Sequence, residues 1–257
     1  MNRPILLATF LLAAFLLPAL LLEGPARAQP QTRPTLPVLT GLPLFWGQGG
    51  VDAVLQPLAV RSPLLREIGA KHQVEAVDTF DADHFRARQL LLAIQPASLP
   101  AEELVALDAW VRRGGRALIF ADPDLIWPTD LAVGDRRRAP VSTLLDPLFG
   151  HWGVALAGHR APVHIVLGKI ANIRVKLVNP GVWHAKSDAC VVRNRGLEAI
   201  CTLGLGQVIL VADADMLDPR LWAEGAPDNA RALQALLARL EMGQATKAGQ
   251  GINGTPR

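Results

Sequence analysis

Residues 90–124 constrain the fold more than any other part of the chain. The segment opens with an unbroken apolar run at residues 90–94, which is typical of a β-strand covered on both faces. Pro100 suits the first turn of a helix, and the glycine pair at residues 114–115 suits its end. A second apolar run follows at residues 117–120. The simplest structure for this pattern is two parallel strands joined by a right-handed helical crossover.

Other strands and helices are expected on both sides of this unit. The strands are expected at residues 42–46, 73–79 and 207–212, and the helices at residues 62–71, at residues 142–152 and after Asp228. We therefore predict an α/β domain at residues 42–242, built on an open, mainly parallel sheet flanked by helices.

Residues 157–205 differ from the rest of this domain, because their short strands are joined by Gly, Asn and Pro turns. We interpret them as a small β-rich insertion on the α/β core. A two-residue turn at residues 195–196 would place Cys190 opposite Cys201 on neighbouring strands. This shared rung favours a structural disulfide in an oxidising compartment, and the alternative is two small buried apolar residues.

The N-terminus resembles a secretion signal. A long apolar run follows Arg3, and residues 26–28 (Ala-Arg-Ala) fit a cleavage site between small residues. Because the run approaches membrane-spanning length, we expect residues 1–28 to be either a cleaved signal peptide or an N-terminal membrane anchor. We expect the protein in the periplasm or another extracytoplasmic compartment.

Two further segments have the composition of linkers or tails. Residues 29–41 are rich in Pro, Thr and Gln and are expected to be an extended linker, and residues 243–257 are expected to be a disordered tail. The formal net charge of +3 is small and evenly spread, which argues against a nucleic-acid partner.

Polar side chains are expected to gather where the predicted parallel strands end, which is where open α/β sheets bind ligands. The residues at these positions are Gln48, Gln95, Asp122, Asp124, Asp213 and Asp215. Two interpretations fit the pair of Asp-x-Asp elements among them. The carboxylates could hold a hard cation or a polar ligand, or they could end the strands and cap the turns that follow.

The sequence offers no nucleophile to accompany these acids. The turn after residue 120 reads Asp-Pro-Asp, the GxSxG motif is absent, and the six histidines lack metal-binding spacing. We expect no cofactor, and we favour a protein without enzymatic activity. The enzymatic alternative is a metal-assisted hydrolase in which the strand-end aspartates hold a cation that polarises water.

Three segments carry a family resemblance: residues 93–124, residues 144–156 (LLDPLFGHWGVAL) and residues 206–218 (GQVILVADADMLD). They resemble the auxiliary component of uncharacterised ABC-type transport systems, a family that includes the gliding-motility GldG-like proteins. The resemblance implies a fold similar to class I glutamine amidotransferases. It also implies the loss of their nucleophilic cysteine, which would fall near residues 122–124.

Together these observations predict a non-catalytic exported domain that binds a ligand or a partner and assists an ABC-type transport or envelope system. The expected partners are the ATPase or permease of an ABC transporter, or other envelope proteins. Contact with the membrane is expected only through the N-terminal segment, if that segment is not cleaved.

Overall fold

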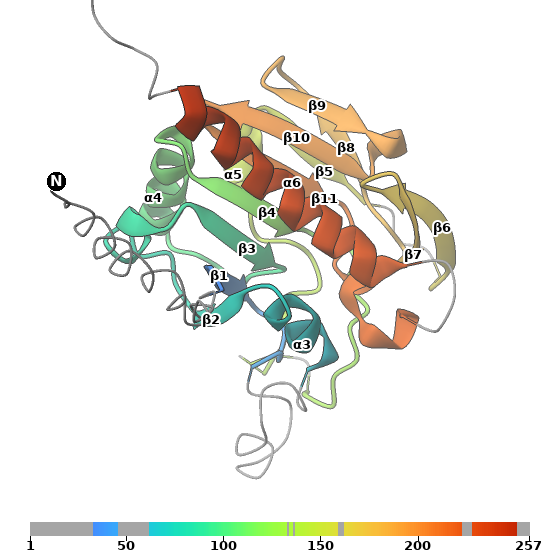
Figure 1. The fold of residues 1–257 in the computed structure, drawn as a ribbon. Coiled ribbons are helices and arrows are strands. Elements are labelled where there is room, and N and C mark those ends of the chain that lie inside the picture. The colour runs from blue at the N-terminus through green and yellow to red at the C-terminus, as the bar shows by residue number, and fades with distance from the viewer. Residues whose placement is uncertain are drawn as a thin grey trace, which may run out of the picture. The chain divides into compact units, whose positions relative to one another are not determined.

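The computed structural model describes residues 33–45, 62–132, 134–135, 137–158, 162–222 and 228–250, with the side chains of the last segment described to residue 242. Figure 1 shows the fold. The predicted signal or anchor at residues 1–28 lies outside the described residues. No helix within the described residues combines the length and the apolar character needed to cross a membrane.

One large sheet organises residues 34–257. Among the described residues it has seven strands, in the order β2 (Gln73–Val77), β1 (Thr35–Thr40), β3 (Leu90–Ile94), β4 (Arg116–Phe120), β11 (Gly206–Val211), β10 (Glu198–Leu203) and β9 (Cys190–Arg193). The first five strands in this order are parallel, and β10 and β9 extend the sheet in antiparallel pairing. The order of the first five strands is one of the two usual orders of doubly wound sheets. The prediction of an α/β fold on a mainly parallel sheet is therefore confirmed.

Alternate residues of the central strands pack into two separate cores, because successive side chains of a strand point to opposite faces. In β3, Leu92 and Ile94 belong to one core, and Leu91 and Ala93 belong to the other. The first core is covered by α3 (Pro63–Gly69), α6 (Asn229–Gln250) and the hairpin of β6 (Ile165–Ile170) with β7 (Ile173–Val178). Figure 1 shows α6 lying across this face.

The opposite face is covered by α4 (Ala101–Arg112), α5 (Asp146–Trp152) and the antiparallel pair of β5 (Val154–Ala157) with β8 (Val182–Ala185). Four short 3₁₀ helices complete the described elements: η1 (His84–Ala87), η2 (Asn194–Gly196), η3 (Asp215–Leu217) and η4 (Pro219–Leu221). The inner strands β3 and β4 are thus buried on both sides, as their apolar composition predicts.

The linker predicted at residues 29–41 is wrong where the structure describes it, because β1 lies there and is an inner strand of the sheet. The first strand was expected at residues 42–46, and the described part of that segment, to residue 45, is bends and turns. Pro37 made the segment look like a linker, since proline is rare in inner strands. β3 pairs with β1 only from Val38 onward, so Pro37 lies outside that ladder.

The β-rich insertion predicted at residues 157–205 is not one unit. β9 and β10 belong to the main sheet, whereas β6–β7 and β5–β8 pack on its two faces. Part of the tail predicted to be disordered also differs from expectation, because α6 continues to Gln250. The rest of the tail lies outside the described residues.

Cys190 and Cys201 face each other on one rung of the β9–β10 pair and form a disulfide. The bond joins the outermost strand of the sheet to its neighbour. Both cysteines are buried, with the core that contains α4 and α5.

Gly206 offers a test of how tightly the α4 crossover packs on the sheet. A Cβ at this position would lie 1.9 Å from the carbonyl oxygen of Val111 and 2.4 Å from that of Gly115. We expect Gly206→Ala to lower the free energy of unfolding by about 2–3 kcal/mol, because both contacts are with backbone that cannot move aside. Urea unfolding measures the change.

Gly150→Ala is the matched control, because no atom lies within 4 Å of the added Cβ in the middle of α5. It should raise the free energy of unfolding by about 0.5–1 kcal/mol through helix propensity. Equal unfolding midpoints for the two variants would contradict the packing described for the crossover.

Candidate functional site

The carboxyl edge of the parallel strands carries a compact group of acids. Asp122 follows β4, and Asp213 and Asp215 follow the neighbouring strand β11. Carboxylate oxygens of these three residues all lie within 4.8 Å of one another. Asp122 and Asp213 are 0% exposed and Asp215 is 3% exposed. We call these three residues the carboxyl cluster.

The carboxylates of the cluster accept hydrogen bonds from the backbone. Asp122 accepts one from the N–H of Asp124 at 2.8 Å and one from the N–H of Ala214, beyond the neighbouring strand, at 2.9 Å. Asp215 accepts a hydrogen bond from the N–H of Ile126 at 2.7 Å. The acid that follows β4 therefore holds the loop after β11 by a hydrogen bond, and an acid that follows β11 holds the loop after β4.

Asp213 joins a third segment to the same edge. One of its oxygens accepts a hydrogen bond from the N–H of Val178, at the end of β7, and the other accepts one from the N–H of Met216, both at 2.7 Å. Among the described residues, the hydrogen-bond partners of the carboxyl cluster are backbone amides, without a Ser, Cys or His side chain. This arrangement holds loops in place and offers no attacking group.

Burial raises the pKa of each acid in the cluster. It raises the pKa of Asp122 to about 6 and that of Asp215 to about 7. The pKa of Asp213 is raised well above its ordinary value, first by burial and then by the neighbouring charge of Asp122. The backbone hydrogen bonds oppose these shifts, because they favour the ionised carboxylate. The cluster therefore retains protons more strongly than exposed acids do.

Gln95 follows β3 beside the point where the strand order reverses, which is where doubly wound sheets usually bind a ligand. Its amide nitrogen donates to the carbonyl oxygens of Asp122 at 3.1 Å and Pro140 at 3.0 Å, and its side-chain oxygen accepts from the N–H of Asp122 at 2.8 Å. Gly41 packs so closely that a Cβ there would lie 2.7 Å from the carbonyl oxygen of Gln95. The residues that follow β1 and β3 are therefore in direct backbone contact at this point.

Of the remaining predicted residues, Asp124 contacts the cluster through its backbone N–H and not through its carboxylate. Asp124 is half-buried and accepts a hydrogen bond from the side chain of Asn179 at 3.3 Å. Gln48 lies outside the described residues. Sequence reasoning missed Asn179, whose side-chain oxygen accepts from the N–H of His164 at 2.9 Å. The Asn-Pro pair that ends the strand at residues 173–178 was the available signal for this turn.

A divalent cation is the one cofactor that the carboxyl cluster could hold, since carboxylate oxygens are the ligands that Ca²⁺ and Mg²⁺ prefer. The described residues between Pro43 and the loop that bears Trp127 enclose about 20 Å³, which is room for about one water molecule.

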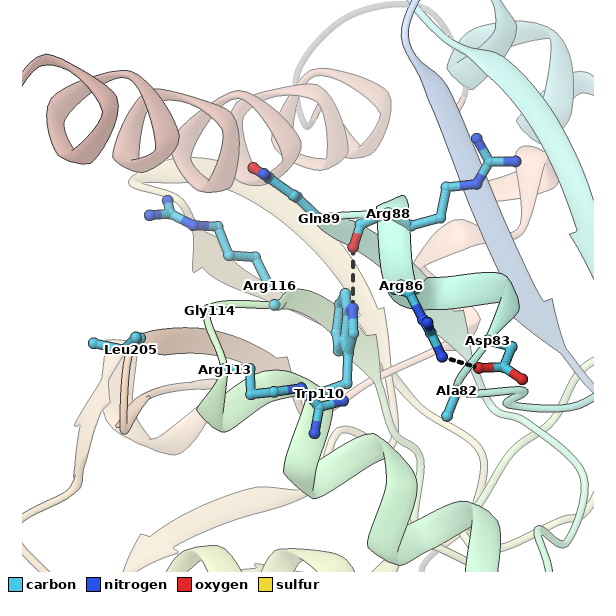
Figure 2. A pocket seen from close by; sticks show the side chains of 11 residues that line it. Ala82, Asp83, Arg86, Arg88, Gln89, Trp110, Arg113, Gly114, Arg116 and Leu205 are labelled. Atoms are coloured by element: carbon cyan, nitrogen blue, oxygen red, sulfur yellow. Dashed lines mark hydrogen bonds and ion pairs between the residues drawn. The ribbon is translucent and has the colours of Figure 1, made fainter. Parts of the chain in front are cut away.

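A much larger pocket, of about 760 Å³, lies at the opposite edge, by the amino ends of β3 and β4 (Figure 2). Trp110 stands in the middle of the view, with Arg116 and Leu205 on one side and Arg86 and Asp83 on the other. The described residues that line this pocket include four arginines, Arg86, Arg88, Arg113 and Arg116, and a single acid.

Three of these arginines are already engaged. Arg86 forms an ion pair with Asp83 at 2.5 Å, and Arg88 forms one with Glu75 at 3.0 Å. Arg116 is buried and donates to a backbone carbonyl of α6 at 2.7 Å. The side chains of Arg86, Arg88 and Arg116 point in different directions in Figure 2. The pocket is positively charged, but its arginines do not converge on one position as they would in a built anion site.

A family model described as "ABC-type uncharacterized transport system" matches residues 49–159. The matched segment contains β3, α4, β4 and the first Asp-x-Asp element, and it ends before Asp213 and Asp215. The match supports an auxiliary ABC-transport family. No curated protein matches the sequence.

Among solved structures, the mmIFT52 N-terminal domain is similar at 11% identity and a TM-score of 0.51, with 80% of this chain and 96% of that one covered. This likeness shows the fold alone. An exo-β-1,4-mannosidase (Op5Man5) from Opitutaceae bacterium strain TAV5 has a TM-score of 0.47 at 13% identity, covering 82% of this chain. The chain spans 36% of the mannosidase's length, and this likeness carries no argument about function.

The raised pKa values predict a stability that depends on pH. Folded-state pKa values of about 6 for Asp122 and about 7 for Asp215 lie above the value of about 4 for an unfolded aspartate, so the folded chain binds protons more tightly. We expect the free energy of unfolding to fall as pH rises from about 4 to about 7, with the cluster contributing on the order of 5 kcal/mol. Urea unfolding across this range measures the slope.

Asp215→Asn should flatten this slope, because the amide oxygen still accepts from Ile126 and the titrating proton is gone. Asp188→Asn, at an exposed aspartate, is the control and should leave the slope unchanged. A slope that Asp215→Asn leaves as steep as in the wild type would show that the cluster does not retain protons.

Proposed function

We propose that the chain is a non-catalytic domain that binds a partner protein in an ABC-type transport system. The single observation that carries this proposal is the match of residues 49–159 to the family model of such a system. The proposed partners are the ATPase or the permease of the transporter, or another envelope protein.

The geometry of the carboxyl edge supports a role without catalysis. Gly41 packs directly on the backbone of Gln95 at the ends of β1 and β3, and the acids of the carboxyl cluster are used to hold backbone amides. The contact surface for a partner would then be the loops that these residues hold. Asp124 is the half-exposed member of the predicted site and could touch a partner directly.

The proposal includes an extracytoplasmic location. The disulfide between Cys190 and Cys201 supports it, because such bonds persist in oxidising compartments. The sequence of residues 1–28 supports it as well, either as a cleaved signal or as an anchor. We further propose membership of the GldG-like group and a glutamine amidotransferase-like fold that lacks its nucleophile.

Co-purification from the cell envelope tests the proposed function. We expect the tagged full-length chain, solubilised in mild detergent, to enrich an ABC-type ATPase or permease at least tenfold over a tagged exported control protein, as judged by quantitative mass spectrometry. Asp124→Ala should reduce this enrichment if Asp124 contacts the partner, and the fold should survive the loss of its 3.3 Å hydrogen bond from Asn179. Absence of both transporter subunits, with no other envelope protein enriched, would refute the proposal.

A second candidate, a metal-assisted hydrolase, is favoured by one observation, the approach of the three carboxylates to within 4.8 Å. In such an enzyme Asp122, Asp213 and Asp215 would hold a cation that polarises water. Asp124 would lie at the border of that site.

Elemental analysis separates the two candidates. The partner-binding proposal expects less than about 0.1 equivalent of divalent metal in the purified protein, and a melting temperature that a chelator leaves unchanged. Stoichiometric metal that is lost on Asp213→Asn substitution would instead support the hydrolase. Asp188→Asn again serves as the exposed control.

A further inference from the structure

The β6–β7 hairpin leaves one edge of β6 unpaired among the described residues. A groove of about 450 Å³ runs between this edge and η2. Its lining includes Leu167, Gly168 and Lys169 of β6 on one side, and Asn194, Arg195 and Leu197 on the other. We call it the β6 groove.

The backbone of β6 presents hydrogen-bonding groups to this groove. Antiparallel partners alternate between pairs that exchange hydrogen bonds and pairs that do not. A two-residue turn joins Ile170 to Ile173, so these two residues exchange backbone hydrogen bonds. At the end of the hairpin away from the turn, the N–H of Asn179 donates to the carbonyl of His164 at 3.2 Å. The even-numbered residues of β6 therefore bond to β7, and the odd-numbered residues point their N–H and C=O groups outward.

Apolar side chains accompany these outward backbone groups. Val163, Ile165 and Leu167 are exposed by 63%, 59% and 64%. Ile165 and Leu167 form an exposed apolar stripe on one face of β6, and Val163 lies just before the strand. An unpaired edge with such a stripe is a template for a further strand.

The turn end of the β6 groove is positively charged. Lys169, Arg174 and Arg195 line it and are exposed, and its described lining contains no acid. None of the three forms an ion pair within the described residues. A segment that lies in the groove would gain from carboxylates at this end.

A buried carboxylate fixes the two sides of the groove relative to each other. Glu198 is 1% exposed, and it accepts from the N–H of Ala171 in the β6–β7 turn and from the side chain of Asn194 in η2 at 2.9 Å. Gly168 has no side chain to place in the groove, and a Cβ there would lie 2.7 Å from a methyl group of Leu197. The groove is therefore formed before anything binds, which reduces the cost of binding.

We propose that an extended segment of a partner protein adds to β6 as a further strand in this groove. Its backbone bonds to the outward groups of Ile165, Leu167 and Lys169, its apolar side chains lie beside the exposed stripe, and its acidic side chains meet Lys169 and Arg195. The inference rests on the proposed function in one respect, that the segment belongs to a protein of the transport system. The groove itself is tested with a synthetic peptide, so the two can fail separately.

The probe is a peptide of about ten residues with alternating Val and Thr and two aspartates at one end, roughly the length of a long strand. Hydrogen exchange measured by NMR on the full-length chain gives the readout. We expect the peptide to slow exchange of the Ile165, Leu167 and Lys169 amides at least tenfold. The amides of Val166 and Gly168 already bond to β7 and should change little.

Two substitutions test the contacts, with matched controls elsewhere on the chain. Lys169→Glu combined with Arg195→Glu should weaken binding about tenfold, whereas Arg113→Glu, at an exposed arginine outside the groove, should not. Leu167→Ser should weaken binding, whereas Leu205→Ser, at a leucine with the same 64% exposure, should not.

Several outcomes would overturn the inference. One is that the peptide fails to bind, and another is that it slows amide exchange at residues of β6 that do not alternate. A third is that a peptide with two lysines in place of the aspartates binds with equal affinity. Protection that grows with protein concentration without peptide would assign the edge to a second copy of this chain instead. If the peptide binds as expected but no transporter subunit co-purifies with the chain, the groove stands and the transport assignment fails.

Discussion

Hydrogen bonding between buried carboxylates and loop amides is the interaction on which the carboxyl edge of this sheet depends. An aspartate offers two acceptor oxygens, whereas an asparagine offers one, and both Asp122 and Asp213 use two. Each such bond to a charged acceptor contributes roughly 1.5–3 kcal/mol, and desolvation of the charge opposes it. The raised pKa values of the three acids show that desolvation outweighs the hydrogen bonds. Acids at strand ends can therefore be structural even when they gather as a metal site would.

The sequence predicts the central unit well because its signals are local. The proline before α4 and the glycines after it place the helix to within one residue, and the apolar runs place β3 and β4. β1 could not be placed, since its Pro and Thr content is that of a linker and only pairing with two other strands makes it inner. β9 and β10 were recognised as strands, but their turn signals do not say which sheet they join.

In the candidate site, as in the fold, local features could be predicted from the sequence and contacts between distant residues could not. The positions of the strand-end acids follow from where β4 and β11 end, so the sequence brings Asp122 near Asp213 and Asp215. Their partners are backbone amides of Val178 and Ile126, which have no signature in the sequence. The contacts of Gln95 likewise depend on Pro140, which is distant in the chain.

The disulfide has a consequence for the outer edge of the main sheet. β9 is the last strand there, and Val191 on it is 54% exposed. A slip of one residue in its pairing would turn every side chain of β9 to the other face, and an edge strand with a free side can also pair with a foreign chain. Because Cys190 is bonded to Cys201, β9 cannot slide along β10 or peel away from it. The covalent link thus acts as a safeguard against aggregation through this edge.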